Sequence, residues 1–544
     1  MTRYNYSRRP TVEVRVASVG IGSSNPVRLQ SMTNLSTNDI EGCTAQSIRI
    51  ADAGGELVRL TTQGVREADS AGQIRRALHD AGCDVPLVAD VHFNPKAAFR
   101  AAETVDKVRI NPGNFVDAAR TFKHLEYTDA EYAAELDKIR GAFLPFLEIC
   151  RKNGTAVRLG VNHGSLSDRI MSRYGDTPAG MVESVMEFLR IAREADFDRI
   201  VISIKASDTV VMTRTVRLLV EKMDAEDMHF PLHLGVTEAG DGDDGRVKSA
   251  VGIGSLLADG LGDTIRVSLS EEPEAEIPVA KLLADYIAER ENHTPIPEPE
   301  RTPEHLHLPA LPGFEKMSWP VAFGVDFTET NLTDAHFADA SQKPIPYGDK
   351  KPMVLTSSHT NRPGELRSWI DRFVLAGGRN PLIVRLRYAD TDPDAVKVKA
   401  AADFGALLLQ DYCTGIWIEA PALSAQEIAE LELGILQATG KRISKTEFVS
   451  CPGCGRTLFD LQKTVARVKA ATSHLKGLKI GVMGCIVNGP GEMAGADYGY
   501  VGAARGKISL YKGKQCIAMN IPEEEAVDRL IALIREGGDW HDPQ

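Results

Sequence analysis

The sequence lacks any uninterrupted apolar run of the roughly 18 residues that a membrane-spanning helix requires. Arg8 and Arg9 are not followed by the apolar stretch of a signal peptide. Cysteine is also scarce, with eight residues among 544, which argues against a disulfide-based fold. These absences predict a soluble protein without a membrane-spanning segment, in a reducing compartment: the cytosol or cytoplasm, or a plastid stroma if a transit peptide has been lost.

Basic residues are outnumbered by acidic ones, since 63 Lys and Arg against 75 Asp and Glu give a net charge of −12. This balance argues against non-specific binding of nucleic acid, so no nucleic-acid partner is expected. The composition, 43% apolar and 25% charged, is that of a globular protein, and the length predicts about two to four domains. An acidic chain that binds an anionic substrate must gather its Arg and Lys side chains in one pocket.

The first part of the chain has no GxGxxG loop after its first predicted strand, which disfavours an open, doubly wound sheet. Instead, eight short β-branched segments alternate with helix-patterned stretches such as Thr209–Met223. Eight such units in about 250 residues predict a closed (β/α)₈ TIM barrel. The predicted strands are Val27–Met32, Leu57–Thr61, Pro86–His92, Lys107–Asn111, Ala156–Asn162, Arg199–Lys205, Pro231–Gly240 and Thr264–Ser270.

The whole chain is predicted to be α/β, with the barrel in residues 1–290, a linker and α/β insert in 291–439, and a small α/β domain in 440–544. A segment rich in Pro, His and Glu, 291–313, is the predicted linker. The insert shows no obvious catalytic cluster, so a role as spacer or interface is expected. Its predicted strands are Val321–Val325, Met353–Thr356, Leu382–Leu386, Ala406–Leu409 and Ile416–Ile418; the chain ends in a predicted helix, Glu523–Glu536.

Polar side chains recur at the C-terminal ends of the predicted barrel strands, which in this fold point into one common mouth. Five of them are cations, and because the planar fork of Arg matches phosphate oxygens, this mouth suits a diphosphate. Alternatively, each Arg faces an ion-pair partner outside the barrel. The cations are Arg59, Arg109, Arg158, Lys205 and Arg266, and the neutral polar residues are Asn111, Asn162 and Ser268.

Two carboxylates, Asp90 and Glu238, are expected at the same mouth. They are candidates for general acid–base catalysis, or for holding the arginines in place. His92 and His163 are alternative proton carriers, but a single histidine at a strand end is more often structural. We therefore favour the two carboxylates.

Three cysteines lie near the C-terminus: Cys451 and Cys454 in CPGC, and Cys485 in GCIVNGPGE, 31 residues after Cys454. A structural zinc site would need a second CxxC or a Cys/His pair, and a thioredoxin-like redox pair needs no third thiol. The pattern favours a [4Fe–4S] cluster with one corner not bound by cysteine. Glu492, Cys516, a water or the substrate could fill that corner, although Cys516 lies in a strand-like stretch and is expected to be a buried thiol.

At these residues the chain resembles the 4-hydroxy-3-methylbut-2-enyl diphosphate synthase family of the methylerythritol phosphate pathway of isoprenoid synthesis. The resemblance covers nearly the whole chain, and the middle segment looks like the insert of the plant-type, three-domain forms. The matching motifs are VRLQSMTN, LVRLT, VADVHF, VRINPGN, VRLGVNHGSL, ISIKAS, LGVTEAG, IRVSLS, SCPGCGRTLFDL and GCIVNGPGE.

The resemblance implies reductive dehydroxylation and ring opening of 2-C-methyl-D-erythritol 2,4-cyclodiphosphate to 4-hydroxy-3-methylbut-2-enyl diphosphate. Two electrons would come from ferredoxin or flavodoxin. The family's cluster ligands fall on Cys451, Cys454, Cys485 and Glu492, and its substrate pocket falls on Asp90, Glu238 and the eight polar residues of the mouth. The resemblance also implies a homodimer in which barrel and cluster domain of different subunits form one site, although the insert leaves that pairing open.

Two other classes of protein combine some of these features. A radical S-adenosylmethionine enzyme also pairs a barrel with three cysteines, but its thiols usually form CxxxCxxC within the barrel. A non-enzymatic iron–sulfur sensor would not need the basic mouth.

Overall fold

A computed structural model describes residues 3–92, 94–117, 126–304, 306, 308–317, 319–486, 489–493 and 495–543. The chain forms two compact units. One contains residues 10–245, 262–280 and 445–544, and thus most of the barrel together with the C-terminal segment. The other contains residues 1–9, 246–261 and 281–444. Each unit is described by itself below.

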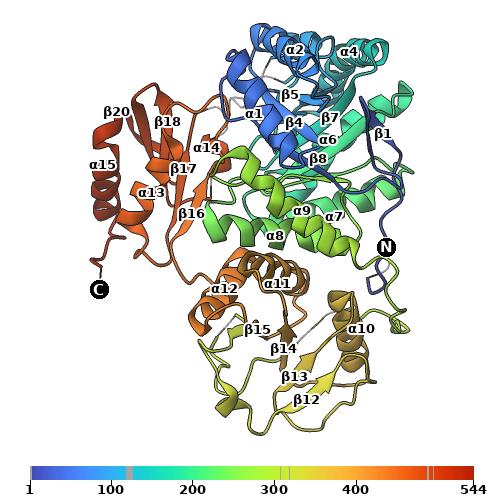
Figure 1. Ribbon diagram of the computed structural model, residues 1–544, viewed down its shortest axis with the longest axis vertical. Coiled ribbons are helices and arrows are strands. Elements are labelled where there is room, and N and C mark those ends of the chain that lie inside the picture. Colours follow the sequence, from blue (N-terminus) through green and yellow to red (C-terminus); the bar gives the residue numbers. More distant parts are fainter. Residues whose placement is uncertain are drawn as a thin grey trace. The chain divides into compact units, whose positions relative to one another are not determined.

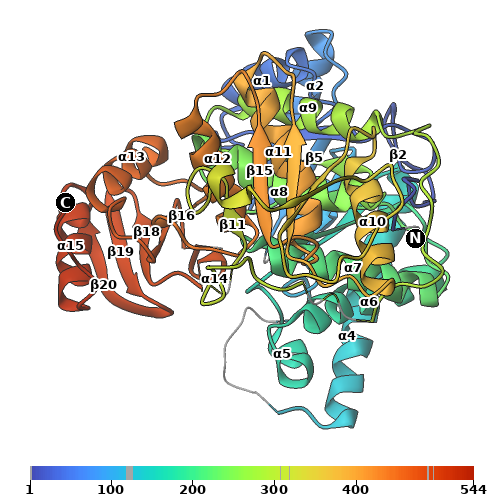
Figure 2. The same ribbon diagram turned by 90° about the horizontal axis from the view of Figure 1, so that it is seen from below.

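Eight parallel strands form the barrel, in the order β8-β7-β6-β5-β4-β3-β10-β9. The two outer strands of this order meet through a parallel bridge between Ile202 and Leu232, so the sheet curls round to a nearly closed barrel (Figures 1 and 2). The predicted (β/α)₈ fold is therefore confirmed. The strands are β3 (Arg28–Met32), β4 (Leu57–Thr62), β5 (Leu87–Val91), β6 (Lys107–Ile110), β7 (Ala156–Asn162), β8 (Ile200–Lys205), β9 (His233–Leu234) and β10 (Thr264–Ile265).

Helices follow the strands, and polar side chains begin several of them by accepting backbone N–H bonds that the first turn leaves free. Thr128 and Glu131 form a capping box at the start of one helix, and Asp208 accepts from the backbone N–H of Val211 at the start of another. The helices are α1 (Ile40–Asp52), α2 (Val65–Asp80), α3 (Pro95–Ala101), α4 (Asp129–Asn153), α5 (Asp168–Tyr174), α6 (Pro178–Glu194), α7 (Thr209–Ala225), α8 (Gly242–Ala258) and α9 (Glu276–Ala288), with a 3₁₀ turn at Pro273–Ala275.

The last two barrel strands are much shorter than predicted. Only two residues each of the predicted Pro231–Gly240 and Thr264–Ser270 remain in the sheet. At Gly235 the backbone comes so near the Lys205 side chain that a Cβ would lie 2.8 Å from Nζ. The residues after β9 and β10 therefore leave the ladder and contribute to the mouth of the barrel.

A hairpin that the sequence did not predict covers the other end of the barrel. It pairs β1 (Val14–Val16) with β2 (Val19–Ile21) in antiparallel register. Its buried Val14, Val16 and Ile21 side chains pack in one apolar cluster with Leu57, Val88, Ala156 and Val201, which lie at or near the N-terminal ends of their strands. The hairpin thereby closes the N-terminal face.

The insert, in the second unit, contains a five-stranded parallel sheet in the order β11-β15-β14-β13-β12. The predicted strand Ala406–Leu409 is wrong, because residues 406–408 end a buried helix that begins after the cap Asp392. A short apolar run fits either structure. The elements are β11 (Val321–Ala322), β12 (His336–Asp339), β13 (Met353–Thr356), β14 (Leu382–Arg387), β15 (Gly415–Glu419), α10 (Arg362–Leu375), α11 (Pro393–Leu408) and α12 (Ala425–Ala438), with a 3₁₀ turn at Glu329–Leu332.

The C-terminal segment, which we call the cluster segment (residues 445–543), forms a mixed sheet in the order β16-β17-β18-β19-β20. Helices α13 and α15 lie against the sheet (Figure 1) and pack on it through residues such as Val465 and Leu530. Met493 belongs to a separate apolar cluster with Val449, Met483 and Val501. The predicted C-terminal helix coincides with α15. The elements are β16 (Glu447–Ser450), β17 (Lys479–Met483), β18 (Tyr498–Ala504), β19 (Lys507–Lys512), β20 (Gln515–Pro522), α13 (Leu461–Thr472), α14 (Gly489–Glu492) and α15 (Glu523–Glu536).

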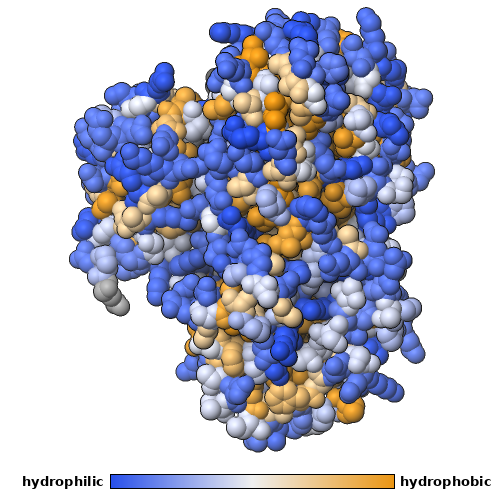
Figure 3. Space-filling model, in the orientation of Figure 1, coloured by the Kyte–Doolittle hydropathy of each residue, from blue (hydrophilic) through white to orange (hydrophobic). Residues whose placement is uncertain are grey.

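Among the residues that the structure covers, no helix combines the length and apolar character needed to cross a bilayer. The face drawn in Figure 3 is mainly hydrophilic, with apolar side chains in scattered patches.

Candidate functional site

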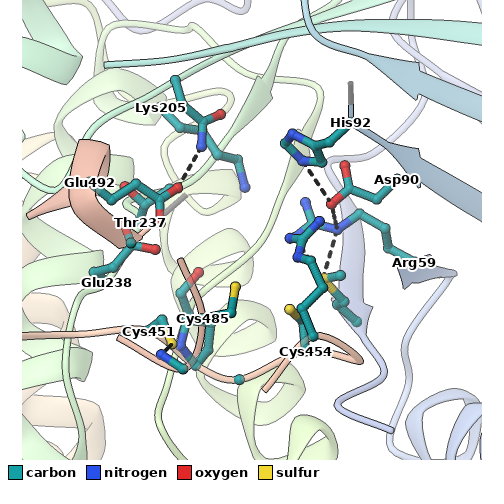
Figure 4. Close-up of a pocket in the computed structure, with 18 of the residues that line it drawn as sticks. Arg59, Asp90, His92, Lys205, Thr237, Glu238, Cys451, Cys454, Cys485 and Glu492 are labelled. Atoms are coloured by element: carbon teal, nitrogen blue, oxygen red, sulfur yellow. Dashed lines mark hydrogen bonds and ion pairs between the residues drawn. The ribbon is translucent and has the colours of Figure 1, made fainter. Parts of the chain in front are cut away.

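One pocket lies within the unit that contains the barrel, where the mouth of the barrel meets the loops after β16 and β17. Figure 4 shows Lys205, Glu238 and Glu492 on one side of it, Arg59, Asp90 and His92 on the other, and the three cysteines along its lower edge. The predicted site residues that line the pocket are Arg59, Asp90, Arg109, Arg158, Asn162, Lys205, Glu238, Arg266, Ser268, Cys451, Cys454, Cys485 and Glu492.

Asn111 and His163 are not among the lining residues. The Asn111 amide donates to Ser165 Oγ at 3.0 Å and accepts from the backbone N–H of Gly113 at 3.0 Å, so it orders the loop after β6. His163 Nε2 lies 3.7 Å from Asp176. The structure thus gives both residues local partners instead of a place in the pocket.

Asp90, at the end of β5, is surrounded by cations. Its carboxylate accepts from Arg109 Nη1 at 2.9 Å and lies 3.8 Å from Arg59 Nε and 3.9 Å from Arg158 Nη2. Burial alone would raise the pKa of this carboxyl, but the charges of Arg59 and Arg109 outweigh that effect and hold it well below its ordinary value. Asp90 is therefore ionised and orients the arginines.

His92 is buried beside Asp90 and Arg109. Its Nε2 contacts Arg109 Nη1 and lies 3.5 Å from Asp90 Oδ2. Burial, and then the charge of Arg109, lower the pKa of His92 to about 3, so the ring is neutral at physiological pH.

Arg266 is fixed by two hydrogen bonds to Glu276 in α9, at 2.9 and 2.8 Å. Ser31 donates to the same carboxylate at 2.7 Å. A guanidinium held in this bidentate way has a fixed orientation, with its charge largely offset by its partner.

Asn162, at the end of β7, connects the barrel to the cluster segment. Its Oδ1 accepts from Arg109 Nη2 at 3.1 Å, and its Nδ2 donates to Glu492 Oε1 at 2.8 Å. Ser207 Oγ donates to the backbone oxygen of Glu492 at 3.4 Å. The carboxylate predicted as fourth cluster ligand is therefore held from the barrel side.

Glu238 has an unusual backbone conformation, with φ at 50°, which is uncommon for a residue other than glycine and is found at functional sites. Its side chain is buried, and Oε2 has no hydrogen-bond partner in the described part of the chain. Burial, and then the neighbouring Glu492 carboxylate, raise the pKa of Glu238 well above its ordinary value. The pair therefore favours a protonated Glu238.

Several polar contacts join the cluster segment to its own barrel. Ser450 pairs with Ala239 in a parallel bridge, and Ser270 Oγ donates to the backbone oxygen of Cys451 at 3.1 Å. Gly164 and Gly491 approach so closely that a Cβ on Gly164, where φ is +82°, would lie 2.6 Å from the Gly491 oxygen. Barrel and cysteine loops of one chain thus form this pocket together.

The three cysteines are partly exposed, and none of them forms a disulfide. The backbone N–H of Gly484 donates to Cys451 Sγ at 3.2 Å, a bond typical of the sulfur ligands of iron–sulfur clusters. Burial raises the pKa of the Cys451 thiol. Within the described ranges, no three His, Cys, Asp or Glu side chains are gathered closely enough to hold a metal ion. The donor set fits a thiolate-bound cluster, but the thiols are not drawn together.

Cys516 lies in β20, outside the pocket, and its thiol is 3.7 Å from the backbone oxygen of Ala518. It is half-buried, so the expectation of a buried thiol is only partly correct. The strand predicted around it is present.

Two family models match the chain: the GcpE TIM-barrel domain over residues 11–281, and the GcpE protein C-terminal domain over residues 447–536. The chain belongs to the GcpE family. A relative from Parabacteroides distasonis is 52% identical over 99% of this chain and 100% of its own length. Relatives from Bacteroides fragilis and Porphyromonas gingivalis are 54% and 48% identical, over 100% and 99% of this chain and 98% and 99% of their own lengths. Each of the three is described as 4-hydroxy-3-methylbut-2-en-1-yl diphosphate synthase (flavodoxin).

Sequence reasoning missed several residues of this GcpE-family pocket, among them Met32, Ser203, Thr237 and Arg456. Met32 Sδ lies 3.0 Å from Arg59 Nε and helps to position that side chain. Arg456 follows Cys454 by two residues. A cation so close in sequence to a candidate cluster ligand could have indicated that Arg456 lies in the pocket.

Proposed function

We propose that this member of the GcpE family is a 4-hydroxy-3-methylbut-2-enyl diphosphate synthase. It would open the ring of 2-C-methyl-D-erythritol 2,4-cyclodiphosphate by breaking one carbon–oxygen bond to phosphate. The hydroxyl of the neighbouring carbon would leave as water, with uptake of two electrons and one proton. The observation that carries this proposal is a pocket in which a cationic barrel mouth faces three cysteines that form no disulfide. Relatives of that description, alignable over almost the full chain, support it.

The barrel cations would bind the diphosphate. Arg158 is fully buried, and its Nε and Nη1 have no hydrogen-bond partner among the described residues. Such donors are costly to leave unpaired, and phosphate oxygens would satisfy them. We assign substrate binding to Arg59, Arg109, Asn111, Arg158, Asn162, Lys205, Arg266 and Ser268, of which Asn111 would act only by ordering its loop.

Cys451, Cys454 and Cys485 would hold a [4Fe–4S] cluster, with Glu492 as an exchangeable fourth ligand. When bound, such a cluster supplies electrons one at a time and a Lewis acid. In the protein itself, Asn162 and Ser207 keep Glu492 at the boundary between barrel and cluster segment. A carboxylate on iron is displaced more readily than a thiolate.

Glu238 would deliver the proton to the leaving hydroxyl. It lines the pocket, is buried, and faces Glu492. Asp90 would keep the arginines oriented toward the phosphates through its contacts to Arg109 and Arg59. Closure of the pocket by the cluster segment would exclude water from these groups.

The electron donor would be flavodoxin, named in the description of the relatives, or ferredoxin. We further propose a homodimer, as the family resemblance implies, and a cytoplasmic location, since none of the eight cysteines forms a disulfide. The division into a barrel (1–290), a linker with insert (291–439) and a cluster domain (440–544) remains our proposal, with the insert as spacer or interface.

Dithionite-driven conversion of the cyclodiphosphate, followed by phosphorus NMR, tests the function. Anaerobically purified protein should be brown, contain iron and sulfide, and consume the substrate. Lack of consumption by protein with a full complement of iron would refute the proposed reaction. Bound zinc without iron would refute the cluster.

A further inference from the structure

Among the described residues that line the pocket, Arg456 is the one cation that comes from the cluster segment. It lies in the loop between β16 and α13, two residues after Cys454, and lines the same pocket as Arg59 and Arg109 of the barrel. The proposed function gives Arg456 no role.

Two of the three guanidinium nitrogens of Arg456, Nε and Nη1, are buried and have no hydrogen-bond partner in the described part of the chain. No carboxylate among the described residues forms an ion pair with this side chain either. Two buried N–H groups without an acceptor are costly, because they have lost their water without gaining a hydrogen-bond partner. The protein therefore keeps two donors ready for a group that it does not itself provide.

The charges around Arg456 indicate the sign of that group. Burial is the main cause that lowers the pKa of Arg59 and of Arg109, and the charge of Arg456 adds to this effect, so Arg456 lies near both barrel cations. Asp90 attracts it, but that carboxylate already accepts from Arg109 and lies within 4 Å of Arg59 and Arg158. Like charges converging from two parts of the chain are favourable only when an anion lies between them.

The cysteines offer a different explanation. Cys454 and Cys485 are also electrostatic neighbours of Arg456, so its guanidinium could instead donate to the sulfurs of a bound cluster. The position beside the barrel arginines favours phosphate binding over donation to the cluster sulfurs. Three guanidinium groups close together match the several oxygens of a diphosphate.

We propose that Arg456 is a substrate-binding residue that the cluster segment carries into the barrel mouth. Its guanidinium binds a phosphate oxygen of the diphosphate that the barrel arginines hold. The bound substrate then joins the two parts of the pocket, and its phosphate adds to the polar contacts of Asn162 and Ser270 with the cluster segment. This inference rests on the proposed function, from which it takes the diphosphate.

The test compares Arg456→Met and Arg456→Lys with Arg467→Met, in iron-loaded protein. Arg467 is exposed on α13 in the same segment, so its replacement makes the same change of charge outside the pocket. The readouts are iron and sulfide content, the electron paramagnetic resonance spectrum of the reduced protein, the affinity for inorganic diphosphate by calorimetry, and KM and kcat for the cyclodiphosphate.

We expect Arg456→Met to weaken diphosphate binding by roughly 10- to 100-fold, as for one lost charge-assisted interaction. KM should rise similarly, while iron content and spectrum stay unchanged. Arg456→Lys should keep part of the affinity, and Arg467→Met all of it. Wild-type diphosphate affinity in Arg456→Met would overturn the inference. If Arg456→Met loses its iron, the Arg456→Lys variant decides the question. Weaker diphosphate binding by Arg456→Lys at full iron content supports the inference. Unchanged binding by that variant overturns it.

These outcomes are separable from failure of the proposed function. Wild-type protein that binds diphosphate but does not convert the cyclodiphosphate would refute the reaction alone. Wild-type conversion with unchanged diphosphate affinity in both Arg456 variants would refute only the role of Arg456.

Discussion

Asn162 Nδ2 donates to Glu492 Oε1 at 2.8 Å, although the two residues are 330 positions apart in the chain. The same amide accepts from Arg109 through Oδ1. One side chain therefore links a phosphate-binding candidate to a candidate cluster ligand.

Asn162→Asp should disrupt this link with almost no change in size. The new carboxylate can still accept from Arg109. It cannot donate to Glu492, and its negative charge lies next to the Glu492 carboxylate. We expect kcat/KM for the cyclodiphosphate to fall about 100-fold, as for a lost charge-assisted hydrogen bond. Asn153→Asp, on the exposed end of α4, is the control and should retain wild-type activity. Equal activity of the two variants would contradict the role of Asn162.

The cysteines give a second prediction. Cys451→Ser should abolish both the iron content and turnover, because Cys451 lines the pocket and its sulfur already accepts a backbone N–H bond. Cys516→Ser should preserve both, because Cys516 lies outside the pocket in β20. Iron analysis and the absorption spectrum of anaerobic protein measure the outcome. Loss of the cluster in Cys516→Ser would mean that the fourth ligand is wrong.

Glu238→Gln keeps the shape of the side chain and removes its proton. We expect kcat to fall by about 10²- to 10⁴-fold, the usual contribution of general acid catalysis. Affinity for inorganic diphosphate should stay within about 3-fold of wild type, since positioned cations supply it. Glu272→Gln, in an exposed position, is the control. An unchanged kcat in Glu238→Gln would assign the proton to another group.

Glu432, on α12 of the insert, predicts a dependence of stability on pH. Its buried carboxylate accepts from the backbone N–H of Ile418 at 2.7 Å, and burial raises its pKa well above the ordinary value. The folded protein therefore keeps a proton that the unfolded chain releases, so this stabilisation is complete below the unfolded pKa and is lost as the pH rises through the folded pKa.

Glu432→Gln cannot ionise, so its folding stability should not fall as the pH rises through this range. We expect its Tm at neutral pH to exceed that of the wild type by about 2 °C or more, which corresponds to about 1 kcal/mol in the free energy of unfolding. Thermal unfolding between pH 5 and pH 8 would measure the effect, with the exposed Glu430→Gln on the same helix as control. A Tm difference between wild type and Glu432→Gln that does not grow with pH would argue against a protonated Glu432.

The sequence predicted the barrel because buried parallel strands leave a strong pattern of β-branched residues. The bounds of β7, β13 and α15 agree with prediction to the residue. The strands of the β1–β2 hairpin have only three residues each, which is too short to show the alternation of apolar and polar residues that identifies a strand. An apolar run such as Ala406–Leu409 fits a buried helix as well as a strand.

The site was predictable where strand ends define it. Because parallel strands end at one mouth, Arg59, Asp90 and Arg158 could be placed together from sequence alone. Arg456 was missed because it lies in a loop with no periodic pattern. The contact between Asn162 and Glu492 depends on how two distant segments meet, which local patterns do not encode.

The β1–β2 hairpin covers the N-terminal face of the barrel through its apolar side chains. At the proposed site, the cyclodiphosphate would enter, and its linear product would leave, through the mouth that the cluster segment covers. Each catalytic cycle would then include an opening and a reclosing of that cover, and the slower of product release and chemistry would set the turnover rate. A change that tightens the Gly164–Gly491 contact would slow the enzyme without touching any reacting atom.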